Sequence, residues 1–188
     1  MKSTSEYLQQ GWWHNIMTMN DELNRSNAFN ELDQILRNDE KLMRLLHYSP
    51  VDEAGRYVNP YDENLPDILT MSNAERYRIE KAHLVKSVKV DTIVNTKTSI
   101  VYVHQGRRRE VFGNRFLMRQ EILVDVLVHN DYQTMDRRLA KICDRLDSLI
   151  VGTRLGLSET IAVNSIPMES PKEYYRYQLR YEFKETMG

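Results

Sequence analysis

Apolar residues recur every three or four positions in three stretches of the chain, the spacing that places them on one face of a helix. The first stretch begins near Ser26, and the second ends before Pro50. The third runs from Met135 to Val151 and is followed by Gly152, a residue type that commonly ends helices. The three apolar faces consist of Phe29, Leu32, Ile35 and Leu36, then Leu42, Met43, Leu45 and Leu46, then Leu139, Ile142, Cys143, Leu146, Leu149 and Ile150. The pattern predicts three amphipathic helices.

Other stretches alternate between apolar and polar residues or are rich in β-branched and aromatic side chains, which predicts β-strands. They cover residues 84–94, 99–104, 116–129, 160–166 and 175–183. In 116–129 both alternating sets are apolar, which is typical of a strand in the middle of a sheet. In 175–183 tyrosine, leucine and phenylalanine alternate strictly with arginine, glutamine and glutamate, so this strand should bury only one face.

The order of these elements predicts an α+β fold, in which helices pack on one face of a largely antiparallel sheet. We expect a single domain over residues 21–188, preceded by an extended N-terminal arm at 1–20. Residues 48–71 contain three prolines, a glycine and several aspartates and asparagines, which indicates a long ordered loop. Loops of this length are often functional. The sequence Ser72-Asn73-Ala74-Glu75 matches a capping box and predicts one or two helical turns after it.

Five aromatic residues are candidate contacts to another subunit or partner. Trp12 and Trp13 are adjacent in the N-terminal arm, Tyr57 and Tyr61 lie in the long loop, and Phe112 lies between two later strands. The two tryptophans need a cover, which comes either from the domain's own core or from a neighbouring subunit.

The most concentrated positive charge is Arg107-Arg108-Arg109, in a segment bounded by Gly106 and Gly113 that we interpret as a loop or hairpin tip. Such a cluster can contact phosphates, so these arginines are candidates for facing a lumen through which DNA passes. Two alternatives stay open: a solvated tip, and pairing with acidic groups of a neighbouring subunit.

The overall composition narrows the function classes. The chain has 26 basic and 27 acidic side chains and a net charge of −1, which argues against a dedicated nucleic-acid-binding protein. No segment approaches the roughly 20 apolar residues that cross a bilayer, and the first residues lack the features of a signal peptide. We therefore expect a soluble protein without a membrane partner, made in the cytoplasm. The single cysteine excludes an intrachain disulfide.

Catalytic patterns are weak. None of the five histidines has the spacing of a metal site, and Cys143 lies on the apolar face of a predicted helix, as a core thiol does. Pro66-Asp67 together with Glu182-Phe183-Lys184 imitates the scattered acid and Glu-x-Lys of a metal-dependent nuclease. Glu182 and Lys184 are, however, also the polar side of an alternating strand. We predict no enzyme activity, no cofactor and no metal.

Two parts of the sequence resemble a known class of proteins. In Glu121-Ile122-Leu123-Val124-Asp125-Val126-Leu127-Val128-His129 a strand leads through Asn130-Asp131-Tyr132 into an amphipathic helix containing Asp136-Arg137-Arg138-Leu139 and Ile142-Cys143-Asp144-Arg145-Leu146-Asp147. This succession resembles tail-terminator and related neck proteins of tailed phages. The stretch from Leu36 to Leu46 and the loop from Pro50 to Pro66 are similar to neck proteins from phages of Gram-positive hosts.

The resemblance implies a structural virion protein of the phage neck. Its subunits would form a ring, usually a hexamer, that joins the tail tube protein to the head connector or stopper protein. The protein would reside in the virion, after assembly in the host cytoplasm, with transient contact to passing DNA. The alternatives are another neck or assembly protein (a stopper, an adaptor or a tail-tube-like subunit) and a nucleic-acid-binding protein or nuclease.

Overall fold

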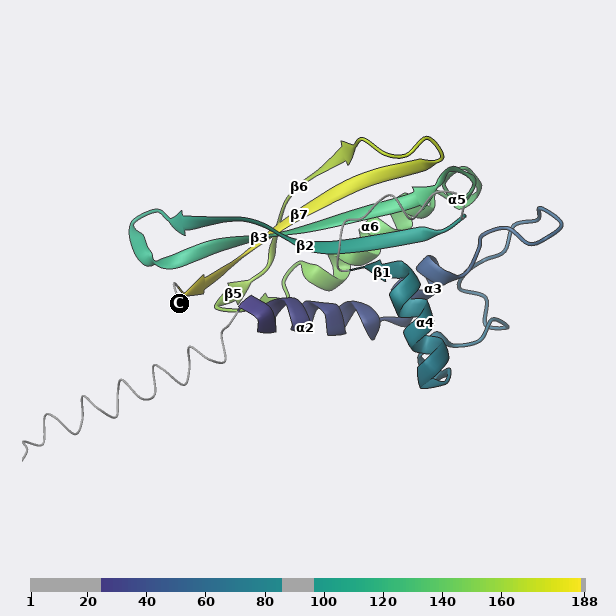
Figure 1. Ribbon diagram of the computed structural model, residues 1–188, viewed down its shortest axis with the longest axis horizontal. Coiled ribbons are helices and arrows are strands. Elements are labelled where there is room, and N and C mark those ends of the chain that lie inside the picture. The colour runs from purple at the N-terminus through teal and green to yellow at the C-terminus, as the bar shows by residue number, and fades with distance from the viewer. Residues whose placement is uncertain (1–24, 86–96, 187–188) are drawn as a thin grey trace, which may run out of the picture.

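The computed structural model describes residues 25–85 and 97–186. Its fold is α+β, as predicted, with helices packed on one face of a largely antiparallel sheet (Figure 1). The helices are α2 (Arg25–Arg37), α3 (Glu40–His47), α4 (Asn73–His83), α5 (Asn130–Asp136) and α6 (Arg138–Ile150), with a short 3-10 helix η1 (Ile68–Thr70). The strands are β1 (Leu84–Val85), β2 (Ser99–Val111), β3 (Asn114–His129), β4 (Arg154–Leu155), β5 (Ser158–Glu159), β6 (Ile161–Met168) and β7 (Tyr174–Thr186).

The main sheet has the order β1-β2-β3-β7-β6. The pair β1 and β2 is parallel, and the other neighbours are antiparallel. Strand β3 lies in the middle, which confirms the prediction from its two apolar faces. The tryptophan-bearing arm at 1–20, and most of the strand predicted at 84–94, lie outside the described residues.

The core lies between the helices and the sheet. Alternate residues of β3, among them Val124 and Val126, are fully buried against α3 and α6 residues such as Leu42 and Ile142. A smaller apolar cluster occupies the opposite face of the sheet and contains Ile100, Tyr102, Leu127 and Tyr174. This division explains why both faces of β3 are apolar in sequence.

The helix predicted at 135–151 is divided in two. Arg137 has a left-handed conformation with φ of 55°, which ends α5 and starts α6. Arg138 is not part of the apolar face predicted for this helix, yet it is fully buried. Its guanidinium contacts the Asp136 carboxylate at 3.0 Å and donates to the backbone oxygens of Leu45 and Tyr48 at the end of α3. Free carbonyl groups at the C-terminus of a helix favour a nearby cation. The end of α3 therefore stabilises the buried charge of Arg138, a contact between segments far apart in the sequence.

Arg44 holds the long segment between α3 and α4 against the end of α3. The Arg44 side chain is buried although it is charged. Its guanidinium donates to the backbone oxygens of Pro60 at 2.9 Å and Pro66 at 3.1 Å. The Tyr48 hydroxyl also donates to the Pro66 oxygen at 2.6 Å. The capping box at Ser72 is present as predicted, but α4 after it runs for 11 residues rather than one or two turns.

Candidate assembly surfaces

Strands β2 and β3 continue past the helices as a projecting hairpin (Figure 1). We call residues 106–120 the hairpin arm. A register shift between Gln105 and Arg108 marks its base, where β2 carries one extra residue relative to β3. Gly106 fits this point because a Cβ atom there would lie 2.7 Å from the Cβ of Glu121. The close approach of the two strands therefore requires glycine at the base of the arm.

The tip of the hairpin arm is apolar and fully exposed. Phe112 and Gly113 form the turn, and Gly113 has φ of 78°, a conformation that favours glycine. The Phe112 side chain has a relative exposure of 103%, and Phe116 one of 70%. Phe112 was a predicted contact residue, whereas Phe116 was missed. Its position four residues beyond Phe112, just past the turn, was the available signal.

Residues 106–113 belong to a hairpin, which is one of the two predicted alternatives, but the three arginines lie in strand β2 and not at the tip that Phe112 and Gly113 form. Arg109 Nη2 contacts Glu121 Oε1 at 2.8 Å and Glu182 Oε1 at 2.6 Å. The two glutamates are direct neighbours in the register of β3 and β7, and both are almost fully buried. Because like charges opposite one another destabilise a sheet, Arg109 acts as their shared counterion.

The other two arginines differ from each other. Arg108 Nε lies 2.7 Å from Glu185 Oε1 of β7, so its charge is also paired within the chain. The backbone N–H of Arg107 donates to Glu121 Oε2 at 3.0 Å. The Arg107 side chain is exposed and forms no ion pair with the residues that the structure describes. Two of the three predicted DNA-facing arginines are thus engaged in holding the arm to the sheet.

Asp125, on the face of the sheet opposite the helices, is the most deeply buried carboxylate of β3. It accepts hydrogen bonds from Arg176 at 2.8 Å, Gln178 at 3.0 Å and His104 at 3.2 Å. Burial alone would raise the pKa of Asp125, but these hydrogen bonds hold it below its ordinary value. The network is fully satisfied at Asp125 and ties β2, β3 and β7 together.

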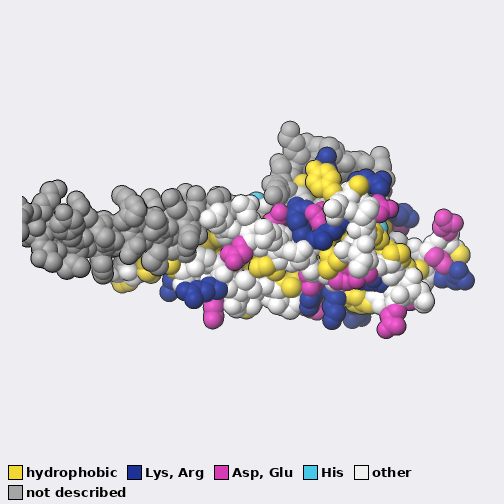
Figure 2. Space-filling model, turned by 90° about the horizontal axis from the view of Figure 1, so that it is seen from below, with side chains coloured by type: hydrophobic (Ala, Val, Ile, Leu, Met, Phe, Trp, Pro, Cys, Tyr) yellow, Lys and Arg dark blue, Asp and Glu magenta, His cyan; other side chains and the backbone are white. Residues whose placement is uncertain are grey.

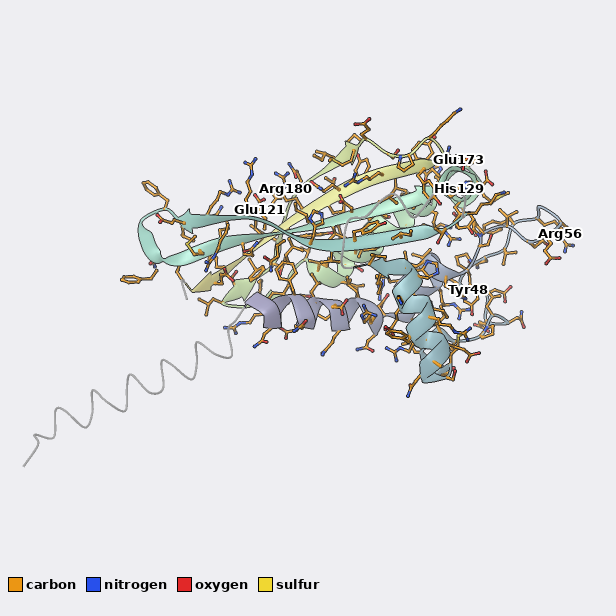
Figure 3. The ribbon with its side chains drawn as sticks, viewed as in Figure 1. Tyr48, Arg56, Glu121, His129, Glu173 and Arg180 are labelled. Atoms are coloured by element: carbon orange, nitrogen blue, oxygen red, sulfur yellow. The ribbon has the colours of Figure 1, made fainter. Side chains whose placement is uncertain are left out.

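The predicted contact residues of the long loop are exposed. The Tyr57 side chain is 51% exposed and that of Tyr61 41%. The backbone of Tyr57 pairs with Val51 in an isolated antiparallel bridge. Arg56, labelled in Figure 3, lies at the end of the molecule opposite the hairpin arm. The molecule therefore presents aromatic residues at both ends of its longest dimension.

Strand β6 is a further surface that the sequence analysis did not single out. All of its residues from Ile161 to Pro167 are exposed. They include the apolar side chains of Ile161, with a relative exposure of 54%, and Val163, with one of 42%. Among the residues that the structure describes, β6 pairs with β7 and with no second strand. Its apolar content predicted the strand but not its position at the edge of the sheet, which exposes it.

The residues of the nuclease hypothesis have other roles. Asp67 caps η1 by accepting from the Leu69 N–H at 2.8 Å, and Glu182 pairs with Arg109. Across residues 25–85 and 97–186, no three histidine, cysteine or carboxylate side chains group as metal ligands do. Burial raises the pKa of the Cys143 thiol to about 12, which makes its thiolate rare at neutral pH. In the same ranges, no helix has the length and apolar character of a membrane span.

A comparison with models of protein families identifies the family of this chain. The model of the YomW family matches residues 39–183, which is more than three quarters of the chain and includes α3, the whole sheet except the end of β7, and α6. No curated protein matches the chain. The chain therefore belongs to the YomW family, a phage-derived (Bacillus SPbeta-like) protein family.

Proposed function

We propose that this protein is a structural subunit of a phage virion, a tail-terminator-like component of the neck. Its copies would form a closed ring, with six subunits as the expected number, between the tail tube protein and the head connector or stopper protein. The ring would reside in the virion after assembly in the host cytoplasm. The protein would act by assembling, without catalysis or a cofactor.

The exposed aromatic tip of the hairpin arm is the observation that supports this proposal. Burying one phenylalanine side chain is worth roughly 1.5–3 kcal/mol, and both Phe112 and Phe116 are exposed on a projecting arm. Exposed apolar groups that cluster on a projection are typical of a contact with a partner. In a ring, one surface of each copy contacts a different surface of the next copy. A projecting arm suits this kind of interface, because the same contact can repeat around the ring.

The surface charge favours an assembly protein over a nucleic-acid-binding one. Acidic and basic side chains are interspersed on the face shown in Figure 2, consistent with the net charge of −1. A transient contact with passing DNA rests on Arg107, because Arg108 and Arg109 pair with carboxylates of the chain itself. The phage origin of the family and the resemblance to neck proteins agree with this assignment.

The native mass of the purified full-length chain tests the proposal, with negative-stain images of the same fraction. We expect closed rings of about six subunits at high concentration, the usual number for the resembled class. The double variant Phe112→Ser/Phe116→Ser should shift the mass towards that of a monomer. Its circular dichroism spectrum should stay unchanged, because neither side chain belongs to the core.

A matched control is Tyr77→Ser, which removes a 62% exposed aromatic residue of α4, away from the hairpin arm. This variant should form the same rings as the unchanged protein. A chain that stays monomeric at every concentration, also when mixed with purified tail tubes, contradicts the proposal. Identification of the virion proteins above and below the ring separates a terminator from a stopper or an adaptor.

A further inference from the structure

We propose that a hollow at the start of β6 binds the Trp12–Trp13 pair of a neighbouring copy. This inference rests on the proposed ring and names the segment and the surface that would meet in it. The hollow is lined by apolar groups of Leu157, Ile161 and Phe183. Its volume is about 540 Å³ and it is open to solvent, with Ile161 54% exposed at its rim.

The sequence supplies an apolar segment that needs such a cover. Residues 1–24 contain both tryptophans of the chain, followed by Ile16, Met17 and Met19. Fully burying a tryptophan side chain removes roughly 150–250 Å² from water, so an adjacent pair provides a large driving force for docking. Ile161 and Leu157 offer the aliphatic surface against which indole rings pack.

The start of α2, to which this segment is joined, lies at the same end of the molecule as the hollow. The first turn of α2 lies beside the β4–β5 hairpin, which forms one wall of the hollow (Figure 1). Arg25 lies twelve positions after Trp13 in the sequence, and a fully extended chain covers about 40 Å over that interval. The radius of gyration of a folded chain of this length is roughly 16 Å, so a neighbouring copy is within reach. We assign the segment to the neighbour because a ring needs one surface that is offered and another that receives.

The charges of the two surfaces are complementary. Arg154 and Lys184 border the hollow, and neither forms an ion pair with another described residue. Glu159 and the paired Glu182 and Arg119 also line it, which leaves one excess positive charge. Residues 1–24 carry three acidic side chains against one lysine. Opposite net charges favour the encounter of these surfaces and make it sensitive to salt.

The edge of β6 that faces away from β7 is a poorer receptor for a backbone that adds as a strand. A register shift between Ala162 and Asn164 leaves Val163 as a bulge, and Pro167 lacks an N–H group. Bulges and prolines are features that prevent edge-to-edge pairing. Docking of side chains in the hollow is therefore favoured over extension of the sheet.

Tryptophan fluorescence of the full-length protein tests the inference directly, because Trp12 and Trp13 are its only tryptophans. At concentrations that give rings, we expect a blue-shifted emission maximum and quenching by acrylamide that is several-fold weaker than in the dilute monomer. Ile161→Asp should abolish both changes, because it places a carboxylate at the rim of the hollow. The matched control is Ile166→Asp, on the same strand five residues further on and 36% exposed, which should leave them intact.

A mixing experiment separates a neighbour's tryptophans from the chain's own. Trp12→Ser/Trp13→Ser has no tryptophan but keeps the hollow, whereas Ile161→Asp keeps both tryptophans but has a defective hollow. Adding the first variant to the second should shift the emission of the second to the blue. Adding more of the Ile161→Asp variant instead should leave its emission unchanged.

Three results would overturn the inference. Emission that is blue-shifted in the dilute monomer would show that each chain covers its own tryptophans. Absence of a shift on mixing would exclude the hollow as the receiving surface. Rings whose tryptophans stay fully quenchable would reject this contact while leaving the proposed ring function intact, and those rings are seen independently by light scattering.

Discussion

The inner and outer halves of the β2–β3 hairpin are stabilised in different ways. In the inner half, Val101 and Val126 are register neighbours buried beneath the helices. In the outer half, the hairpin arm, arginines of β2 pair with carboxylates of β3 and β7. The same backbone ladder thus runs from an apolar core into a charged projection. A single regular pair of strands therefore carries both part of the buried core and the most exposed candidate contact of the described residues.

The largest effect should follow from a cavity in the inner half. Ile122 is 1% exposed and lies in the core cluster, so Ile122→Ala should lower the free energy of unfolding by roughly 2–5 kcal/mol. The matched change on the arm, Phe116→Ala, should alter it by less than about 0.5 kcal/mol. Urea denaturation followed by circular dichroism, at a concentration where the protein is monomeric, measures both. Equal losses would mean that the arm contributes to the core as much as the inner half does.

A smaller effect should follow from loss of the arginine that neutralises Glu121 and Glu182. Arg109 is itself half exposed, so solvent screens part of the interaction, and Arg109→Ala should cost about 1–2 kcal/mol. Arg107→Ala should cost less than about 0.5 kcal/mol, because its side chain has no ion-pair partner among the described residues. The same denaturation measurement distinguishes them. If the two variants were equally stable, the ion pairs of the arm would contribute nothing.

The smallest effect should be a pH dependence of the free energy of unfolding, caused by His83, which contacts the inner half of the hairpin at Ser99. Burial lowers the pKa of His83 from its ordinary value of 6.5, although its Nδ1 lies 2.8 Å from the Ser99 oxygen. The unfolded chain then binds a proton more readily than the folded one, so the contribution is complete above pH 6.5 and decreases as the pH falls below it. Stability at pH 5 should be lower than at pH 7. His83→Gln should reduce this difference, leaving the share due to His47, whose pKa burial also lowers.

The candidate surfaces were predictable only in part. Phe112 was found because glycines flank its segment, and Tyr57 because prolines delimit its loop. The ion pairs of Arg108 and Arg109 were not predictable, because their β7 partners Glu185 and Glu182 lie more than seventy residues away in the sequence. The residues of β6 were predicted as a strand, but exposure depends on which strand occupies the edge of the sheet.

The sequence alone was enough to predict α2, α3, α6, β2, β3, β6 and β7, although not the break at Arg137, because the period of apolar residues reflects which side of each element meets the core. It also determined the α+β class and the central place of β3, since only a covered strand is apolar on both faces. Tertiary structure alone decided that Arg138 and Arg44 are buried, because backbone oxygens from distant segments replace water around their charges. It also decided that the hairpin arm projects, because the helices that cover the inner half of the hairpin end before the arm begins.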